Sequence, residues 1–215
     1  MSNIKFGYWR VRGRGQVPRL LLSYTGALWE DAQYTQPDQW FGKDKVGLGL
    51  EFPNLPYLIE GDLKMTETSA ICFYICQRSE KGRSLLGQDL QEGAKIMNVV
   101  GVVSDLLETI NKMAYDKDPE ALREKTWELL ASKLEYLKKF KGNKEWLFDR
   151  LTLADFLVSE LSHYIEFIFS DRFGQFVFLK EIQCKFAQLP EIKNYYEQPN
   201  AIKAPFTAPV ATIKF

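Results

Sequence analysis

The chain is almost without histidine, since His163 is the only one among 215 residues. One imidazole cannot form a multi-histidine metal site, and it lies in a strongly helical segment, unlike a triad member. Cysteine is scarce too, with only Cys72, Cys76 and Cys184. Cys72 and Cys76 are four residues apart on an apolar helix, where buried reduced thiols are a better interpretation than metal ligands. We expect a reduced, metal-free protein.

Long apolar runs and an excess of one charge are also missing. No stretch of about 18 apolar residues is available for a membrane span, and the first ten residues, MSNIKFGYWR, lack the apolar core of a signal peptide. Lys and Arg total 28, as do Asp and Glu. The charge balance therefore favours neither nucleic acid nor an anionic membrane as a partner. These absences predict a cytoplasmic protein.

Residues 1–82 alternate between strand and helix patterns. The segment IKFGYW places Ile4, Phe6 and Tyr8 on one side of a strand, and the helical pattern of GRGQVPRLLLSYTG follows. The segment ALWEDAQY makes a second strand, so the three form a βαβ unit with parallel strands. A hairpin over residues 57–65 and a helix over 66–78 complete a βαβ-ββα order. This order predicts a thioredoxin-like domain.

Residues 89–215 have an almost wholly helical pattern. Segment 79–88 has the composition of a linker. Helical apolar spacing then covers residues 89–115, 119–140, 152–169 and 176–189. Thr152 and Asp155 have the spacing of a capping box, and the proline-punctuated tail after residue 197 predicts irregular chain. The predicted fold is a small α/β domain followed by a larger all-helical bundle domain.

Four motifs carry a family resemblance: GYW, RLLLSYTG, GLEFPNLPYLIEGDLKMT and LTLADFLV. In this order and spacing they span nearly the whole chain, which resembles a cytosolic glutathione transferase of the mu class. The resemblance implies a homodimeric enzyme that adds the thiolate of reduced glutathione to small, mostly hydrophobic electrophiles in detoxification. Residues 1–82 would bind glutathione, and residues 89–215 would contribute the electrophile pocket. Glutathione is then a co-substrate, and no permanently bound cofactor is implied.

Tyr8 matches the catalytic tyrosine of the family, whose hydroxyl donates to the glutathione sulfur and favours the thiolate. Without the resemblance, an aromatic side chain on a strand would be read as core. Trp9 and Trp40 match tryptophans beside the glycyl end of glutathione, although ordinary packing explains both as well. The family lysine for the glycyl carboxylate has no counterpart at its usual spacing. Counting back from LGLEF favours Lys45 over Lys43, and a solvated loop lysine is the alternative for both.

The segment NLP matches a second part of the family's glutathione-binding site. The family has a cis peptide bond before the matching proline, here Leu55–Pro56, which follows Asn54. The backbone of Leu55 would then pair with the cysteinyl part of glutathione. At the helix start beyond the hairpin, the backbone amides and the Thr68 hydroxyl would hold the γ-glutamyl carboxylate. Glu67 would face the γ-glutamyl ammonium.

Further matches concern the neighbouring subunit and the second substrate. Asp105 precedes Tyr115 by ten residues, as in the family, where the aspartate reaches the glutathione site of the partner subunit and the tyrosine borders the electrophile. A solvated helix face and core packing are their alternatives. Phe52 matches an aromatic residue that inserts into the partner subunit, although such loop residues usually pack locally. The second substrate would lie between the domains, near Val11, Arg14, Tyr115 and Phe206.

Three positions depart from the mu pattern. The loop TQPD before Trp40 is short and lacks an arginine, which affects one glycyl contact. Glu67 stands where glutamine is usual, so its charge favours the ammonium but opposes the nearby carboxylate. Arg14 stands where the pocket is usually apolar, which would favour polar or anionic electrophiles unless its side chain extends to solvent.

Other functions remain to be weighed against conjugation. A non-catalytic binding or structural protein can use the same scaffold, but a complete glutathione constellation argues against it. A thiol–disulfide oxidoreductase needs a reactive cysteine after the first strand, where this chain has Tyr8 and Arg10. Isomerase or peroxidase use of the same thiolate stays open, because the activating residues would be identical.

Overall fold

A four-stranded mixed sheet forms the centre of the first of two structural units. The computed structural model describes residues 3–214, and within this range the units comprise residues up to 83 with 191–208, and residues 84–190 with those from 209 onward. The sheet has the strand order β2-β1-β3-β4. Its bounds are Ile4–Trp9 for β1, Trp29–Tyr34 for β2, Tyr57–Glu60 for β3 and Leu63–Thr66 for β4.

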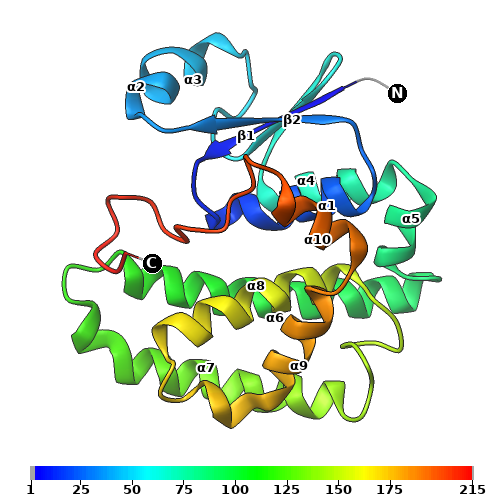
Figure 1. The fold of residues 1–215 in the computed structure, drawn as a ribbon, viewed down its shortest axis with the longest axis vertical. Helices are drawn as coiled ribbons and strands as arrows, with labels where there is room; N and C mark the ends of the chain where they lie inside the picture. The colour runs from blue at the N-terminus through cyan, green and yellow to red at the C-terminus, as the bar shows by residue number, and fades with distance from the viewer. Residues whose placement is uncertain (1–2, 215) are drawn as a thin grey trace. The chain divides into compact units, whose positions relative to one another are not determined.

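Strand register confirms the predicted βαβ-ββα order. β1 pairs with β2 in parallel, with Tyr8 opposite Gln33, and with β3 in antiparallel. α1 (Gln16–Tyr24) and α4 (Thr68–Gln77) pack against each other and cover one face of the sheet (Figure 1). Short helical turns α2 (Pro37–Gln39) and α3 (Lys45–Gly47) flank a π-helical turn at Trp40–Asp44. The sheet thus places the C-terminal end of β1, which carries Tyr8, beside the start of α1.

Four long or medium helices make up the second unit, as the apolar spacing predicts. They are α6 (Leu90–Ala114), α7 (Pro119–Lys141), α8 (Leu153–Ile168) and α9 (Val177–Phe186). α8 is buried almost all round because it packs against both α6 and α9, while α7 packs against α6. The predicted capping box is present: the Thr152 N–H donates to Asp155 Oδ2 over 2.8 Å.

The segment after α4 corrects one prediction. Residues 79–88, whose composition is that of a linker, contain α5 (Glu80–Arg83) and a 3-10 turn at Ser84–Leu86. Gly82 allows the close approach, because an added Cβ there would lie 2.3 Å from the carbonyl oxygen of Cys76. The hairpin also ends later than expected. Thr66 closes β4, so α4 begins at Thr68 with Glu67 as its N-cap.

A further helix, α10 (Pro190–Glu197), was not predicted from the sequence. Only Ile192 and Tyr195 of this helix are buried, so its apolar stripe is too narrow to stand out as a helical pattern. Residues 198–214 have no regular structure, as the prolines indicate. Residues 191–208 belong to the first unit although they follow the helical region in the sequence.

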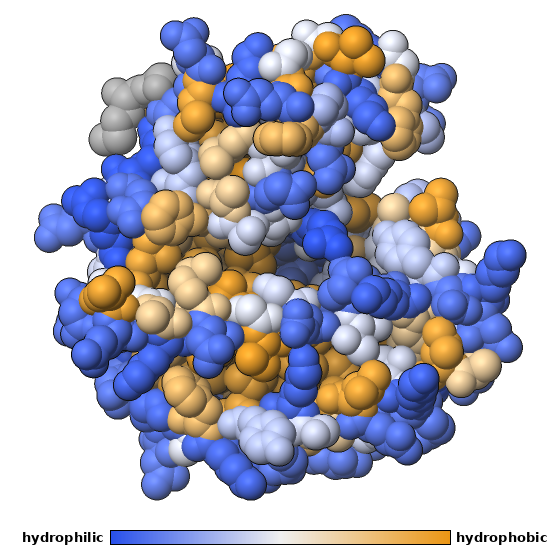
Figure 2. All heavy atoms as spheres, turned by 180° about the vertical axis from the view of Figure 1, so that it is seen from behind, coloured by the Kyte–Doolittle hydropathy of each residue, from blue (hydrophilic) through white to orange (hydrophobic). Residues whose placement is uncertain are grey.

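Apolar side chains also occur at the surface, interspersed with hydrophilic ones (Figure 2). The most exposed of these in the two units include Phe52 at 74%, Leu90 at 88% and Val46 at 85%. No helix among residues 3–214 combines the length and the hydropathy that crossing a bilayer requires.

Candidate active site

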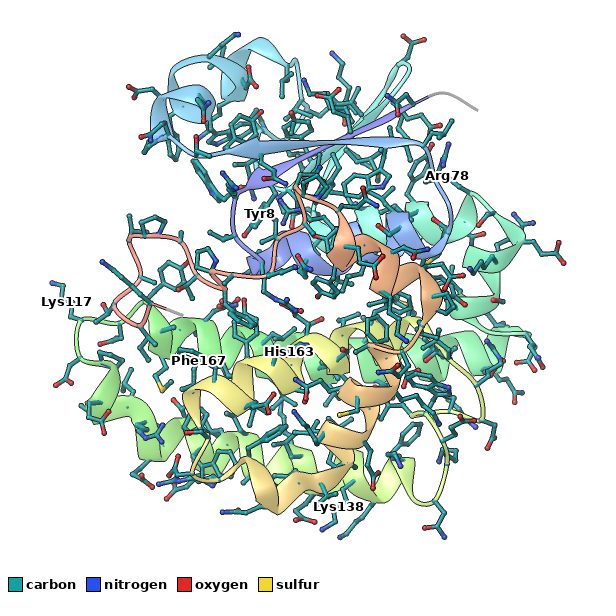
Figure 3. All side chains as sticks on the ribbon, in the orientation of Figure 1. Tyr8, Arg78, Lys117, Lys138, His163 and Phe167 are labelled. Carbon is teal, nitrogen blue, oxygen red and sulfur yellow. The ribbon has the colours of Figure 1, made fainter. Side chains whose placement is uncertain are left out.

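Tyr8 lies at the C-terminal end of β1, 8% exposed (Figure 3). Its hydroxyl oxygen accepts a hydrogen bond of 3.1 Å from the backbone N–H of Arg14. The loop after β1 packs closely on the ring: a Cβ added at Gly15 would lie 2.5 Å from Tyr8 Cδ1. Hydrogen bonds in series polarise one another, so an N–H bond to the phenol oxygen strengthens the phenol as a donor.

Arg19 holds the same loop from inside the unit, and sequence reasoning did not find it. Its guanidinium is fully buried and forms an ion pair of 2.9 Å with Asp31 on β2. It also donates to the carbonyl oxygens of Val11 over 2.8 Å and of Trp9 over 3.1 Å. The helical pattern gave no sign of this burial, because Arg19 lies about 200° around the helix from Val17, on the side opposite the apolar residues Val17 and Leu21.

The NLP segment has the backbone that the resemblance implies, because the Leu55–Pro56 peptide bond is cis. The Leu55 N–H donates to Asn54 Oδ1 over 2.9 Å. The Asn54 amide reaches Glu67 Oε1 over 3.4 Å. Glu67, with φ at 69°, precedes α4, of which Thr68 is the first residue. Five predicted glutathione-binding residues are therefore close to one another at the N-terminus of α4.

The two tryptophans belong to an aromatic cluster. Trp40 is 3% exposed and stacks on Tyr57, with ring centroids 6.1 Å apart. Trp9 meets Tyr34 edge-on at 6.0 Å and lies 6.0 Å from Phe41. The Trp40 ring thus has the packing role that was its alternative interpretation, and Trp9 is only half-buried.

Tyr34 ties this cluster to the π-helical turn. Its hydroxyl donates to Asp44 over 2.6 Å and lies 3.0 Å from the Tyr57 hydroxyl. Burial, together with the hydrogen bond to Asp44, raises the pKa of Tyr34. Burial likewise raises the pKa of Tyr57. Both phenols are therefore neutral at physiological pH and fix the turn that presents the candidate lysines.

The two lysines differ in their surroundings. Lys43 lines a shallow open cleft of about 220 Å³ together with Gln33 and Gln39. The Lys45 ammonium lies 5.5 Å from the centre of the Phe41 ring. Both belong to the segment 40–47 that follows Trp40, and the geometry does not single out one of them for a carboxylate.

Residues predicted for the second substrate and the partner subunit fall in both units. In the first unit Val11 is buried, Arg14 is exposed and Phe206 is half-buried. In the second unit Tyr115 caps α6 with 45% exposure. Asp105, with a side chain 71% exposed, lies 3.2 Å from the Lys133 ammonium on α7. Phe52 is highly exposed instead of packed locally.

The cysteines have no site of their own. All three are free thiols, with Cys72 and Cys76 buried in α4 and Cys184 exposed on α9. Burial raises the pKa of Cys72, and it raises the pKa of Cys76 to about 12. Neither thiol forms the thiolate that disulfide exchange requires at neutral pH.

Comparisons with known proteins agree with this architecture. The family model described as "Glutathione S-transferase, N-terminal domain" matches residues 4–77, and "Glutathione S-transferase, C-terminal domain" matches residues 104–199. The glutathione S-transferase class-mu 26 kDa isozyme of Schistosoma mansoni is 34% identical over 94% of this chain and 91% of its own length. Glutathione S-transferase Mu 4 of Mus musculus is 31% identical over 96% of both chains.

Two solved structures are similar over almost the full length. The crystal structure of the glutathione S-transferase Blo t 8 covers 98% of this chain and 100% of its own, with 28% identity and a TM-score of 0.85. NaGST-2, at 24% identity and a TM-score of 0.79 over 93% of this chain and 98% of its own, shares the fold.

Proposed function

We propose a residue-level mechanism from one premise: the chain belongs to the glutathione S-transferase family, in its mu class. It is a transferase that conjugates glutathione to electrophiles. Tyr8 is the catalytic residue, and its hydroxyl donates a hydrogen bond to the glutathione sulfur. The observation that carries this assignment is the bond from the Arg14 N–H to the Tyr8 oxygen, which orients and polarises the phenol at the end of β1.

One hydrogen bond is energetically sufficient for activation. A thiol with a pKa of about 8.5 must lose roughly two pKa units to be mostly ionised at pH 7, which corresponds to about 2.7 kcal/mol. A hydrogen bond to a charged group contributes about 1.5–3 kcal/mol, and a nearby helix terminus adds about 0.3–1 kcal/mol. Tyr8 therefore stabilises the thiolate without a general base, and catalysis consists of this stabilisation together with positioning.

The γ-glutamyl and cysteinyl parts of glutathione bind beside α4. The backbone amides at the start of α4 and the Thr68 hydroxyl hold the γ-glutamyl carboxylate, and Glu67 faces the ammonium. The backbone of Leu55, beside Pro56, pairs with the cysteinyl residue. The Leu55 N–H already donates to Asn54 Oδ1, so bound glutathione replaces that bond and releases the Asn54 side chain to a new partner.

Trp9, Trp40 and Lys45 serve the glycyl end. An indole N–H is a donor only and suits a carboxylate. The half-buried Trp9 supports this role more strongly than Trp40, whose ring is packed on Tyr57. Lys45, or Lys43 from the neighbouring cleft, supplies the positive charge.

The enzyme works as a homodimer in the cytoplasm, where it detoxifies electrophiles without a permanently bound cofactor. The exposed Phe52 inserts into the partner subunit, and Asp105 reaches the γ-glutamyl ammonium in the partner's site. Exposed positions for both residues support this.

Residues 1–82 bind glutathione and 89–215 shape the electrophile pocket, to which Val11, Arg14, Tyr115 and Phe206 contribute. Three free thiols suit a reducing compartment.

A conjugation assay tests this function against a non-catalytic role. Purified protein is titrated with glutathione in a calorimeter, and initial rates with a chloronitrobenzene and with an unsaturated ketone are followed by absorbance. The proposal predicts glutathione binding and saturable rates above the uncatalysed reaction. Binding of glutathione without a rate above background for any member of an electrophile panel would contradict it and favour a binding module.

A further inference from the structure

The C-terminal segment of the first unit runs along the loop that follows Tyr8. We call residues 201–207 the strap and residues 10–15 the Tyr8 loop. The Arg12 N–H donates to the Pro205 carbonyl over 2.8 Å, and the Gly13 N–H donates to the Phe206 carbonyl over 2.9 Å. Figure 1 shows this orange-to-red segment beside the start of α1. Two consecutive loop amides are thus bound by two consecutive strap carbonyls.

The Arg12 side chain fastens the strap a second time. Arg12 is 3% exposed. Its guanidinium donates to the Tyr196 hydroxyl over 3.1 Å and to the Lys203 carbonyl over 3.4 Å. The same group lies over the Phe206 ring, 4.7 Å from its centre. A planar guanidinium that donates at its edge and stacks on its face fixes its partners more tightly than an ammonium does.

Two tyrosines of α10 complete the attachment. The Gln16 amide, fully buried at the start of α1, donates to the Tyr196 hydroxyl over 3.2 Å. The Tyr195 hydroxyl accepts from the Ile202 N–H over 3.1 Å. The Tyr8 loop, α10 and the strap therefore form one connected hydrogen-bond network, and networks of this kind rigidify the elements that they join.

The next amide along the loop is the one that serves Tyr8. The Arg12 and Gly13 amides bind the strap, and the Arg14 amide binds the Tyr8 hydroxyl. Gly13 has φ at 37°, a conformation that glycine adopts without strain but does not prefer strongly. External bonds are therefore needed to select one orientation for the following N–H. Arg19 fixes the loop on the other side through the carbonyls of Trp9 and Val11.

We propose that the strap is a positioning element for the thiolate-stabilising hydroxyl, and that Arg12 is its positioning residue. Arg12 holds the strap carbonyls on the loop, and the loop in turn directs the Arg14 N–H at Tyr8. When this attachment is lost, the phenol donates to the glutathione sulfur less effectively. The inference rests on the proposed role of Tyr8, and its effect falls on thiol ionisation more than on glutathione binding.

The test measures the pKa of the bound glutathione thiol by thiolate ultraviolet absorbance in the full-length protein. In Arg12→Met this pKa rises by about one unit, from about 6.5 to about 7.5, so the ionised fraction and with it kcat fall roughly fivefold at pH 6.5 and recover above pH 8.5. KM for glutathione changes less than about threefold, because the lost interaction affects thiol ionisation more than glutathione binding. Arg12→Lys, which keeps a donor but not the planar group, shows a smaller rise.

Arg123→Met is the matched control. Arg123, in the helical unit, also donates to a backbone carbonyl, that of Ile168 over 2.7 Å, and its guanidinium lies 4.8 Å from the centre of the Phe169 ring. Its loss lowers thermal stability in the same way but leaves the thiol pKa at the parent value. Equal pKa values in the Arg12→Met and Arg123→Met proteins would overturn the proposal.

A milder variant covers the case in which Arg12→Met does not fold. Tyr196→Phe keeps the ring and removes only the hydroxyl that accepts from Arg12 and Gln16, so a smaller rise in the thiol pKa is expected, and an unchanged pKa counts against the strap. Tyr8→Phe separates the two proposals. If it shifts the thiol pKa and the strap variants do not, only the strap inference fails. If Tyr8→Phe itself leaves the pKa unchanged, both fail.

Discussion

At the scale of single residues, Tyr8 depends on the absence of a side chain at Gly15. An added Cβ would lie 2.5 Å from Cδ1 and 2.8 Å from Cγ of the tyrosine ring, so Gly15→Ala must push the ring or the loop aside. We expect kcat at pH 7 to fall by roughly ten- to a hundredfold, since a 1 Å misplacement of a reacting group has effects of this order. Steady-state rates at saturating glutathione measure it.

Gly174→Ala is the matched control for that substitution. Nothing lies within 4 Å of a Cβ added at Gly174, and the residue belongs to a turn of the helical unit. Its rate should equal that of the parent. If Gly15→Ala were equally silent, the close packing of the loop on the Tyr8 ring would have no bearing on catalysis.

The cysteines give a second prediction at this scale. Burial raises the pKa of Cys72 and raises that of Cys76 to about 12, whereas Cys184 is exposed. Because the thiolate is the reactive form, iodoacetamide at pH 8 should modify Cys184 and leave the other two intact. Peptide mass spectrometry of the native protein, with the urea-unfolded protein as control, reads this out. Rapid native labelling of Cys72 would contradict the burial of α4.

At the scale of elements, the capping box of α8 is also a titrating group. Burial raises the pKa of Asp155 to about 6, and hydrogen bonds from Leu147 and Thr152 oppose that rise. A carboxyl whose pKa is raised on folding binds its proton more tightly in the folded state. Its contribution to the free energy of unfolding is therefore greatest below pH 4 and is lost as the pH rises through 6.

Asp155→Asn should accordingly cost more stability in acid than at neutral pH. The variant removes the titrating group, so the cost at pH 4.5 should exceed the cost at pH 7.5 by about 2 kcal/mol. Urea unfolding at both pH values measures the difference. Asp149→Asn, at an exposed neighbouring position, should change little at either pH. An equal cost for Asp155→Asn at both pH values would contradict the raised pKa.

Elements differed in how well the sequence predicted them. Period-two alternation predicted β1, and the Thr152 and Asp155 spacing predicted the start of α8, because both signals are local. The linker composition of 79–88 concealed α5, since a helix of four residues carries no apolar stripe. α10 was missed for a similar reason, since only Ile192 and Tyr195 are buried and Tyr195 donates to Gln16, a residue 179 positions away.

In the candidate site, too, a feature of contiguous residues was predicted, whereas contacts between residues distant in the sequence were not. The cis bond at Leu55–Pro56 was expected from the family resemblance, which the contiguous NLP motif carries. The Arg12–Tyr196 and Arg19–Asp31 contacts join residues 184 and 12 positions apart. No periodicity or spacing encodes the partner of a buried arginine, so both required the structure.

At the scale of the whole molecule, the proposed dimer is the feature to test. The chain has a mass of 24.9 kDa, so sedimentation should give twice that value. Phe52 is 74% exposed in the single subunit, and the proposed dimer would bury its side chain against the partner subunit. Phe52→Ser should raise the dimer dissociation constant by more than tenfold, because burial of a phenylalanine side chain contributes about 1.5–3 kcal/mol.

Val210→Ser serves as the control for the dimer experiment. Val210 is 83% exposed and is not assigned to the interface, so sedimentation of this variant should match the parent. A parent protein that sediments as a monomer at micromolar concentration would contradict the dimer and, with it, the role of Asp105.

The central claim is that the Tyr8 hydroxyl stabilises the glutathione thiolate, and one titration tests it most directly. The ultraviolet absorbance of the thiolate is followed against pH with saturating glutathione, in the parent and in Tyr8→Phe. The account predicts a thiol pKa roughly two units below the free value of about 8.5 in the parent, and loss of most of that shift in the variant with binding retained. An unshifted pKa in the parent, or an equal shift in both proteins, would contradict it.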